Sequence, residues 1–156
     1  MIHLITRDNI EGFDKMVPGL ERALTKTTLG KSWDIQSLYD SLVNLQAFAF
    51  HQVESQYSGV FTISEAPLIK SLYWFWSGKE PSNKTPIDFS EVDAFLTAAA
   101  RYFQCGQIIG EGRKGWAKVS APFGYTEDSV ICIKEVRYEL PEIQPTAPDG
   151  GESTTG

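Results

Sequence analysis

Apolar residues recur at helical spacing in two stretches of the chain, and each stretch predicts a surface helix that covers a sheet. The first runs from 34 to 45 and the second from 89 to 105. In both, apolar side chains return every three or four residues and polar ones occupy the other side. The N-cap candidates are Ser32 or Asp34 for the first helix and Asp88 or Ser90 for the second, and Gly106 is placed to end the second helix. An earlier helix begins near Asp8, and Pro18-Gly19 is expected to kink or split it.

Strand patterns fill most of the remaining chain. A central run of three closely spaced strands predicts an antiparallel meander, with a bulge suggested at Gly59. A strand on each side of the second helix then requires a right-handed crossover and a parallel pair. The fold class is therefore α/β: a mixed central sheet with helices on both faces. The predicted strands are 1–5, 46–53, 57–64, 68–76, 107–112 and 128–138.

The C-terminal stretch 139–156 has a different composition. It holds three prolines and three glycines, and the four acidic residues after Arg137 have no basic neighbour. Only Leu140 and Ile143 are sizeable apolar residues, too few to offset the entropy of ordering the chain. We expect one domain over 1–138 and a flexible acidic tail over 139–156.

Charge and composition exclude several classes of function. The formal charge of −6 leaves no basic footprint for nucleic acid, and no run approaches the length of a membrane span, so neither partner is expected. No cationic, apolar leader opens the chain. His3 and His51 have no Cys, Asp or Glu at ligand spacing, so no metal site is predicted. Cys105 and Cys132 are interpreted as buried small apolar residues.

The stretch AAARYFQCGQIIGEGRKGWAKVSAPFGYTEDSVICIKE, residues 98–135, resembles the GNAT (N-acetyltransferase)-like family of tailed bacteriophages. The element order over 1–137 agrees with that fold. The resemblance implies a virion-associated protein whose partners are other virion proteins, present in multiple copies, with the virion as its location. The positions that carry the resemblance are Cys105, Gly112, Arg113, Gly115, Trp116, Gly124 and Tyr125.

A working member of the GNAT family would bind acetyl-CoA through a glycine-rich cradle after the central strand, beside a V-shaped gap between neighbouring strands. Here that place reads WSGKEPSNKTPIDFSEV, with one glycine, Gly78, and with Pro81 and Pro86, which lack an N–H. The tyrosine that donates a proton to the departing thiolate in the family is also missing. Ser120 stands at its position, four residues before Gly124, and Tyr125 follows that glycine. We therefore expect no cofactor and assign no catalytic residue.

Three hypotheses for the function of the chain remain. The leading hypothesis is a phage structural or internal virion protein on a degenerate acetyltransferase fold. The alternative is an acyl-CoA-dependent N-acetyltransferase with a divergent phosphate loop, and the weaker alternative is a module that binds a host protein. Under the enzyme hypothesis, acetyl-CoA would contact Gly78, Lys79, Lys84 and Arg113.

The GRKGW segment, residues 112–116, has two interpretations. It is either a packing corner or an exposed Arg113–Lys114 pair at a helix start that holds an anion. We expect Trp116 to be mostly buried, in close contact with Gly115. The residues assigned to partner binding are Arg113, Lys114, Trp116, Leu140 and Ile143.

Overall fold

The computed structural model describes residues 1–113 and 115–138. The chain divides into two units, Met1–Thr126 and a second unit that begins at Glu127, and each is considered by itself. The sequence-based predictions for Lys114, Leu140, Ile143 and the whole stretch 139–156 lie outside the described residues. None of the described helices has the length and hydrophobicity that a membrane span requires.

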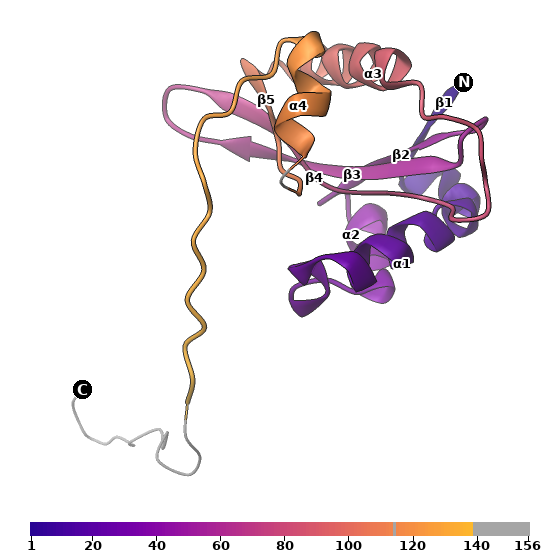
Figure 1. Ribbon diagram of the computed structural model, residues 1–156, viewed down its shortest axis with the longest axis horizontal. Coiled ribbons are helices and arrows are strands. Elements are labelled where there is room, and N and C mark those ends of the chain that lie inside the picture. Colours follow the sequence, from indigo (N-terminus) through magenta and orange to yellow (C-terminus); the bar gives the residue numbers. More distant parts are fainter. Residues whose placement is uncertain (114, 139–156) are drawn as a thin grey trace. The chain divides into compact units, whose positions relative to one another are not determined.

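A five-stranded mixed sheet organises the first unit, in the order β1-β2-β3-β4-β5 (Figure 1). The first four strands are antiparallel neighbours, and β5 runs parallel to β4. The mixed sheet, the meander and the parallel crossover are thereby confirmed. The strands are β1 (Ile2–Ile5), β2 (Phe48–Gln52), β3 (Tyr57–Glu65), β4 (Lys70–Lys79) and β5 (Gln107–Gly110).

Helices cover both faces of this sheet, as expected. The α1 and α2 helices lie on one face, and α3 and α4 lie on the other (Figure 1). The helices are the 3-10 segment η1 (Arg7–Lys15), α1 (Val17–Lys26), the 3-10 segment η2 (Thr28–Lys31), α2 (Ile35–Val43), α3 (Phe89–Tyr102), α4 (Trp116–Ser120) and the 3-10 turn η3 (Ala121–Phe123).

Side-chain caps begin the two long predicted helices. The Asp34 carboxylate accepts from the backbone N–H of Ser37, and the Asp88 carboxylate accepts from that of Glu91. Each bond satisfies a donor that the first helical turn leaves free. Of the two candidates at each helix start, the caps are therefore Asp34 rather than Ser32 and Asp88 rather than Ser90.

The early helix is split, as expected, into η1 and α1, and Pro18 stands in the first turn of α1, where its missing N–H is not needed. The prediction for the end of the later helix, α3, is wrong. At the end of α3 the left-handed residue is Gln104, with φ of 60°, rather than Gly106. Gly106 instead makes room for a side chain, because a Cβ there would lie 2.9 Å from Cγ1 of Ile69.

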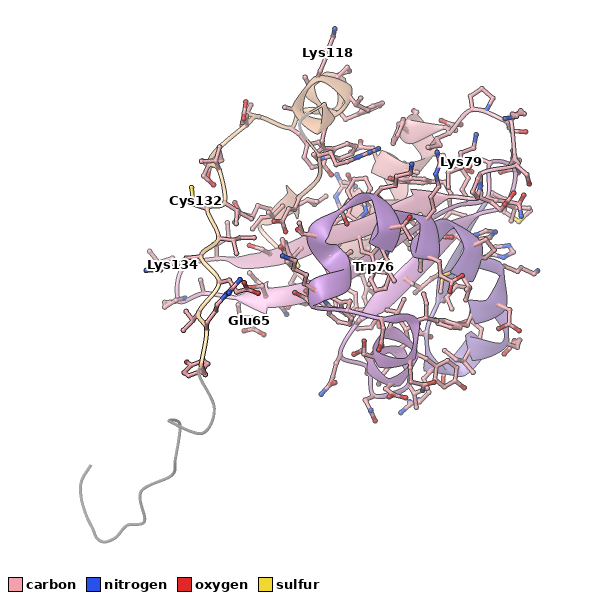
Figure 2. All side chains as sticks on the ribbon, turned by 60° about the horizontal axis from the view of Figure 1, so that its bottom comes forward. Glu65, Trp76, Lys79, Lys118, Cys132 and Lys134 are labelled. Carbon is pink, nitrogen blue, oxygen red and sulfur yellow. The ribbon has the colours of Figure 1, made fainter. Side chains whose placement is uncertain are left out.

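A β-bulge in β4 divides its aromatic residues between the two faces. Val60 pairs with Trp76 and Phe61 pairs with Trp74, so Phe75 is the extra residue. Trp74 consequently joins the core under α3, whereas Trp76 joins the core under α1. Trp76 donates its Nε1–H to the backbone oxygen of Leu20 at 3.1 Å, behind the α1 ribbon in Figure 2.

The bulge lies close to the position that the sequence suggested but not at Gly59 itself. Gly59 has a different role, because a Cβ there would lie 2.5 Å from the ring of Phe50. Apolar and polar residues do not alternate regularly after Leu72, and the extra residue of the bulge accounts for part of this irregularity.

The prediction of a last strand over 128–138 is wrong. Alternation supplies the side-chain pattern of a strand, but a strand also needs a partner for its backbone groups. No described strand pairing includes this segment. The expectation that Cys132 is buried is also wrong, since its side chain is exposed, while Cys105 is partly buried.

Candidate functional site

The parallel strands β4 and β5 part at a defined point, which we call the fork. Trp74 and Gly110 form their last pair, and the N–H of Glu111 donates to the backbone oxygen of Trp74 at 2.9 Å. Beyond this pair β5 has ended, while β4 continues to Lys79. The fork is therefore the place where a gap between neighbouring strands opens in this fold.

The indole of Trp116 covers the fork on the α3 side. Its ring centroid lies 4.8 Å from that of Trp74, at an interplanar angle of 89°, and 6.2 Å from that of Phe89. A Cβ added to Gly110 would stand 2.9 Å from the indole Nε1, and one added to Gly112 would stand 3.0 Å from Cγ. Two glycines, one at the end of β5 and one in the following turn, thus create the space that the indole occupies.

Trp116 differs in part from its prediction. Its burial agrees with the prediction, since most of the side chain is covered and a smaller part is exposed. Gly115 is not the contact, because nothing lies within 4 Å of a Cβ placed there. The glycines that accommodate the ring are Gly110 and Gly112, which precede it on the strand end and the following turn. This packing agrees with the interpretation of GRKGW as a packing corner.

A second aromatic residue, Tyr125, packs against Trp116 at the fork. Gly124 adopts a φ of 90°, and this left-handed turn ends η3. The chain then returns so that the Tyr125 ring lies 6.2 Å from that of Trp116. Burial raises the pKa of Tyr125 to about 12, with the nearby Asp93 carboxylate adding to the effect.

Little space remains among these rings. The cavity between α3, α4 and Trp74 has a volume of about 10 Å³, close to the minimum for one water molecule. The Tyr125 hydroxyl, which is buried, has no hydrogen-bond partner in the described chain. One water suffices to satisfy it, but a pantetheine-sized chain does not fit this arrangement.

The connection from β4 to α3 also differs from a phosphate cradle. Its backbone N–H groups turn toward acceptors within the chain: Glu80 donates to the oxygen of Gln56, Thr85 to Asn83 Oδ1, and Asp88 to Gln52 Oε1. The Gln52 side chain also donates back to the Asp88 oxygen at 3.0 Å. These bonds hold the connection against the β2–β3 side of the sheet.

The residues proposed to contact acetyl-CoA lie on separate elements. Gly78 and Lys79 belong to β4, paired with Ser58 and Tyr57 of β3. Lys84 is exposed in the connection to α3, and Arg113 is exposed in the turn before α4. In Figure 2, Lys79 lies on a different part of the unit from Lys118 of α4, the helix that follows Arg113. The four residues thus come from three parts of the chain: β4, the connection to α3 and the turn before α4.

The structure gives Gly78 a packing role. A Cβ on Gly78 would lie 1.9 Å from the backbone oxygen of Gly19, and one on Gly19 would lie 2.6 Å from the oxygen of Gly78. Two glycines therefore allow α1 to contact the end of β4 backbone to backbone. The single glycine of the expected cradle is explained by this contact without a ligand.

A hydrogen bond between a tyrosine hydroxyl and a carboxylate lies at the fork. The Tyr73 hydroxyl donates to Oε1 of Glu111, directly after β5. Burial, the hydrogen bond and the negative charge of Glu111 raise the pKa of Tyr73 to about 12. The sequence analysis did not assign Tyr73 or Trp74 to a site. The feature that could have indicated them is the aromatic run YWFW, residues 73–76. No group of three or more potential metal ligands occurs among the described residues.

Comparison with known proteins identifies the fold only. No model of a known protein family matches the chain, and no curated protein does. Solved acetyltransferase structures match over nearly their full length, at identities that establish a shared fold and nothing finer.

Three of these structures illustrate the likeness. A ribosomal-protein-alanine N-acetyltransferase from Brucella melitensis biovar Abortus 2308 gives a TM-score of 0.62 at 10% identity, covering 88% of this chain and 98% of that one. A GNAT family acetyltransferase from Staphylococcus aureus gives a TM-score of 0.60 at 9% identity, covering 87% of this chain and 98% of that one. A protein from Clostridium acetobutylicum described as a predicted acetyltransferase, solved with acetyl-CoA, gives a TM-score of 0.61 at 12% identity, covering 91% of this chain and 97% of that one. The chain has the GNAT fold.

Proposed function

We propose that this chain is a non-catalytic protein built on the GNAT fold, and that it serves as a structural or internal component of a bacteriophage particle. The two parts of this function have different support. Loss of cofactor chemistry rests on the geometry of the fork. The phage particle rests on the resemblance of residues 98–135 to virion-associated proteins.

The filled fork is the observation that carries the first part. Trp116 lies on the last β4–β5 pair, Tyr125 packs beside it, and about 10 Å³ remains between them. An acyl-CoA would have to displace both rings and would then meet a connection whose N–H groups are already bonded within the chain. Such binding is unfavourable because displacement would return the apolar surface of both rings to water.

For the second part, contacts with other virion proteins would involve Arg113 and Lys114 together with Leu140 and Ile143. Arg113 is exposed, as this requires, whereas Trp116 has its ring turned onto Trp74 and is not offered as a docking residue. Multiple copies in the particle are part of the proposal.

One observation favours the alternative, an acyl-CoA-dependent N-acetyltransferase. The Tyr125 hydroxyl is buried at the fork without a partner among the described residues, and like an ordinary tyrosine it is protonated at neutral pH. A protonated hydroxyl at this place suits an acid that delivers its proton to a departing thiolate. In this alternative Trp116 must first swing out of the fork.

Thermal unfolding with acetyl-CoA separates the two functions. We expect no change of the melting temperature of the intact protein in about 1 mM acetyl-CoA, a dose chosen to exceed typical cofactor affinities. Desulfo-CoA serves as the second ligand, since it keeps the phosphates and removes the reactive sulfur. A saturable stabilisation by both ligands would favour the enzyme.

Mass spectrometry of purified particles tests the structural role. In particles of a phage that carries this gene, we expect the chain in a constant ratio to the capsid protein after nuclease and salt washes. Absence from washed particles, with abundance in the infected cell, would contradict the virion role and favour a module that binds a host protein.

A further inference from the structure

A second cavity lies on the opposite face of the sheet from the fork, under η1. It has a volume of about 200 Å³ and is lined by residues of β1, η1 and β2. Neither part of the proposed function uses it. The lining residues are His3, Ile5, Asn9, Glu11, Gly12, Lys15 and His51.

The buried wall of this cavity contains a histidine with a fixed orientation. His51 is only 4% exposed, and its Nδ1 lies 2.8 Å from Oγ of Ser58, on the neighbouring strand. In the tautomer in which the Ser58 hydroxyl donates to Nδ1, the ring proton of His51 resides on Nε2. In that tautomer His51 has a donor on the side of the ring away from Ser58.

Charged groups of both signs lie around His51: Lys15 favours an anion, and Glu11 opposes it. His3 stands directly opposite His51 in the β1–β2 pairing, and Lys15 lines the same cavity from η1. Burial lowers the pKa of His51, and the positive charges of Lys15 and His3 lower it further. Glu11 is the only carboxylate among the lining residues, so it opposes a second negative charge on a ligand.

The rest of the wall is apolar or open. Ile5 is 4% exposed, and Gly12 adjoins it so closely that a Cβ on Gly12 would lie 2.8 Å from Ile5 Cδ1. Asn9 does not compete for a ligand, since its amide bonds Thr6 and Leu4 and thereby fixes η1 on β1. A cavity of about 150 Å³ already accommodates benzene, so this one is large enough for a small organic molecule.

We propose that this cavity binds a short-chain monocarboxylate, with its carboxylate on His51 Nε2–H and Lys15 and its alkyl part against Ile5 and Gly12. The donors select an anion, Glu11 disfavours a dianion, and the apolar wall disfavours inorganic phosphate. The site is distinct from the fork and does not depend on the proposed function.

Histidine NMR gives a direct test. The chain has two histidines, so the imidazole ¹⁵N resonances of His3 and His51 can be followed in the full chain during titration with sodium propanoate at neutral pH. Sodium chloride at equal ionic strength is the reference. We expect saturable shifts of the His51 Nε2 resonance with a dissociation constant on the order of millimolar, as suits a ligand of few atoms.

Two variants locate the binding. Lys15→Gln should weaken propanoate binding at least about fivefold, as expected for loss of a charge-assisted bond, whereas the matched control Lys26→Gln, on α1, should leave it unchanged. Gly12→Ala, which places a methyl group toward Ile5, should also weaken it. Chemical shifts of distant residues report whether each variant is folded.

Three results would overturn the proposal. The first is no shift of His51 in the intact chain beyond that caused by sodium chloride. The second is equal binding by Lys15→Gln and Lys26→Gln. The third is that sodium phosphate saturates the site more tightly than propanoate, which would reject the carboxylate.

Discussion

Replacing Gly78 with alanine tests whether this glycine packs the fold or forms a cofactor loop. The new Cβ would lie 1.9 Å from the backbone oxygen of Gly19 and 2.7 Å from its carbonyl carbon. Ordinary contact begins near 3.4 Å, so α1 would have to withdraw from β4 by about 1.5 Å. Because the obstacle is backbone, no side chain can rotate to relieve the overlap.

The cost follows from what α1 carries. Overpacking of a core costs roughly 1–3 kcal/mol. Withdrawal of α1 also breaks the bond from Trp76 Nε1–H to Leu20, and a buried donor left unpaired costs about 1–3 kcal/mol more. We therefore expect Gly78→Ala to lower the free energy of unfolding by about 2–6 kcal/mol, a large share of the ordinary stability of a domain.

Urea denaturation followed by tryptophan fluorescence measures this change. Gly115→Ala is the matched control, since its Cβ meets nothing within 4 Å, and it should stay within about 0.5 kcal/mol of the parent chain. A Gly78→Ala protein as stable as the control would refute the packing role and restore the cradle interpretation of Gly78.

Three further predictions concern the aromatic rings at the fork and the buried histidine. Trp116→Ala should destabilise the protein by about 2–4 kcal/mol, below the full range for a core tryptophan because the ring is partly exposed, whereas Tyr102→Ala, 81% exposed, should have little effect in the same urea assay. Tyr125→Phe should be nearly neutral at neutral pH, since the hydroxyl has no partner among the described residues. The raised pKa of Tyr125 adds stability that is complete below about pH 10 and lost as the pH rises through about 12, so the variant should lose less stability in that range. His51 has a pKa lowered from 6.5, so its contribution is present above that pH and lost on acidification, and His51→Gln should flatten the stability profile below pH 6.5.

Each of these has a contrary outcome. Equal stabilities of the Trp116 and Tyr102 variants would show that the indole does not pack at the fork. A Tyr125→Phe protein that is destabilised by more than about 1 kcal/mol would mean that its hydroxyl is bonded. An unchanged acid profile in His51→Gln would place the acid-sensitive group elsewhere.

Periodicity predicted the helices, the meander and the parallel crossover because these depend on local patterns of burial. Asp34 and Asp88 were also found from sequence, since a cap is a local hydrogen bond. What could not be predicted depends on contacts between distant residues. The left-handed residue after α3 is Gln104, although a glycine stands two positions later and is needed for Ile69.

The candidate site was harder to predict than the fold. The sequence indicated a missing cradle from two prolines and a single glycine, but Gly78 owes its presence to Gly19, which lies far earlier in the chain. The sequence also paired Trp116 with Gly115, its neighbour in the chain, whereas the ring packs on Gly110 and Gly112. The sequence analysis rejected Tyr125 as the family's proton donor because of its position in the chain. The turn at Gly124 is what places its ring at the fork.

Tryptophan indole NMR tests the central claim, that aromatic side chains fill the fork and leave no place for acyl-CoA. The chain has four tryptophans, and Trp116→Phe assigns the relevant indole N–H resonance. With acetyl-CoA added in large excess, we expect the Trp74 and Trp116 resonances to keep their positions. Saturable shifts of both, with a dissociation constant in the low micromolar range, would contradict the claim.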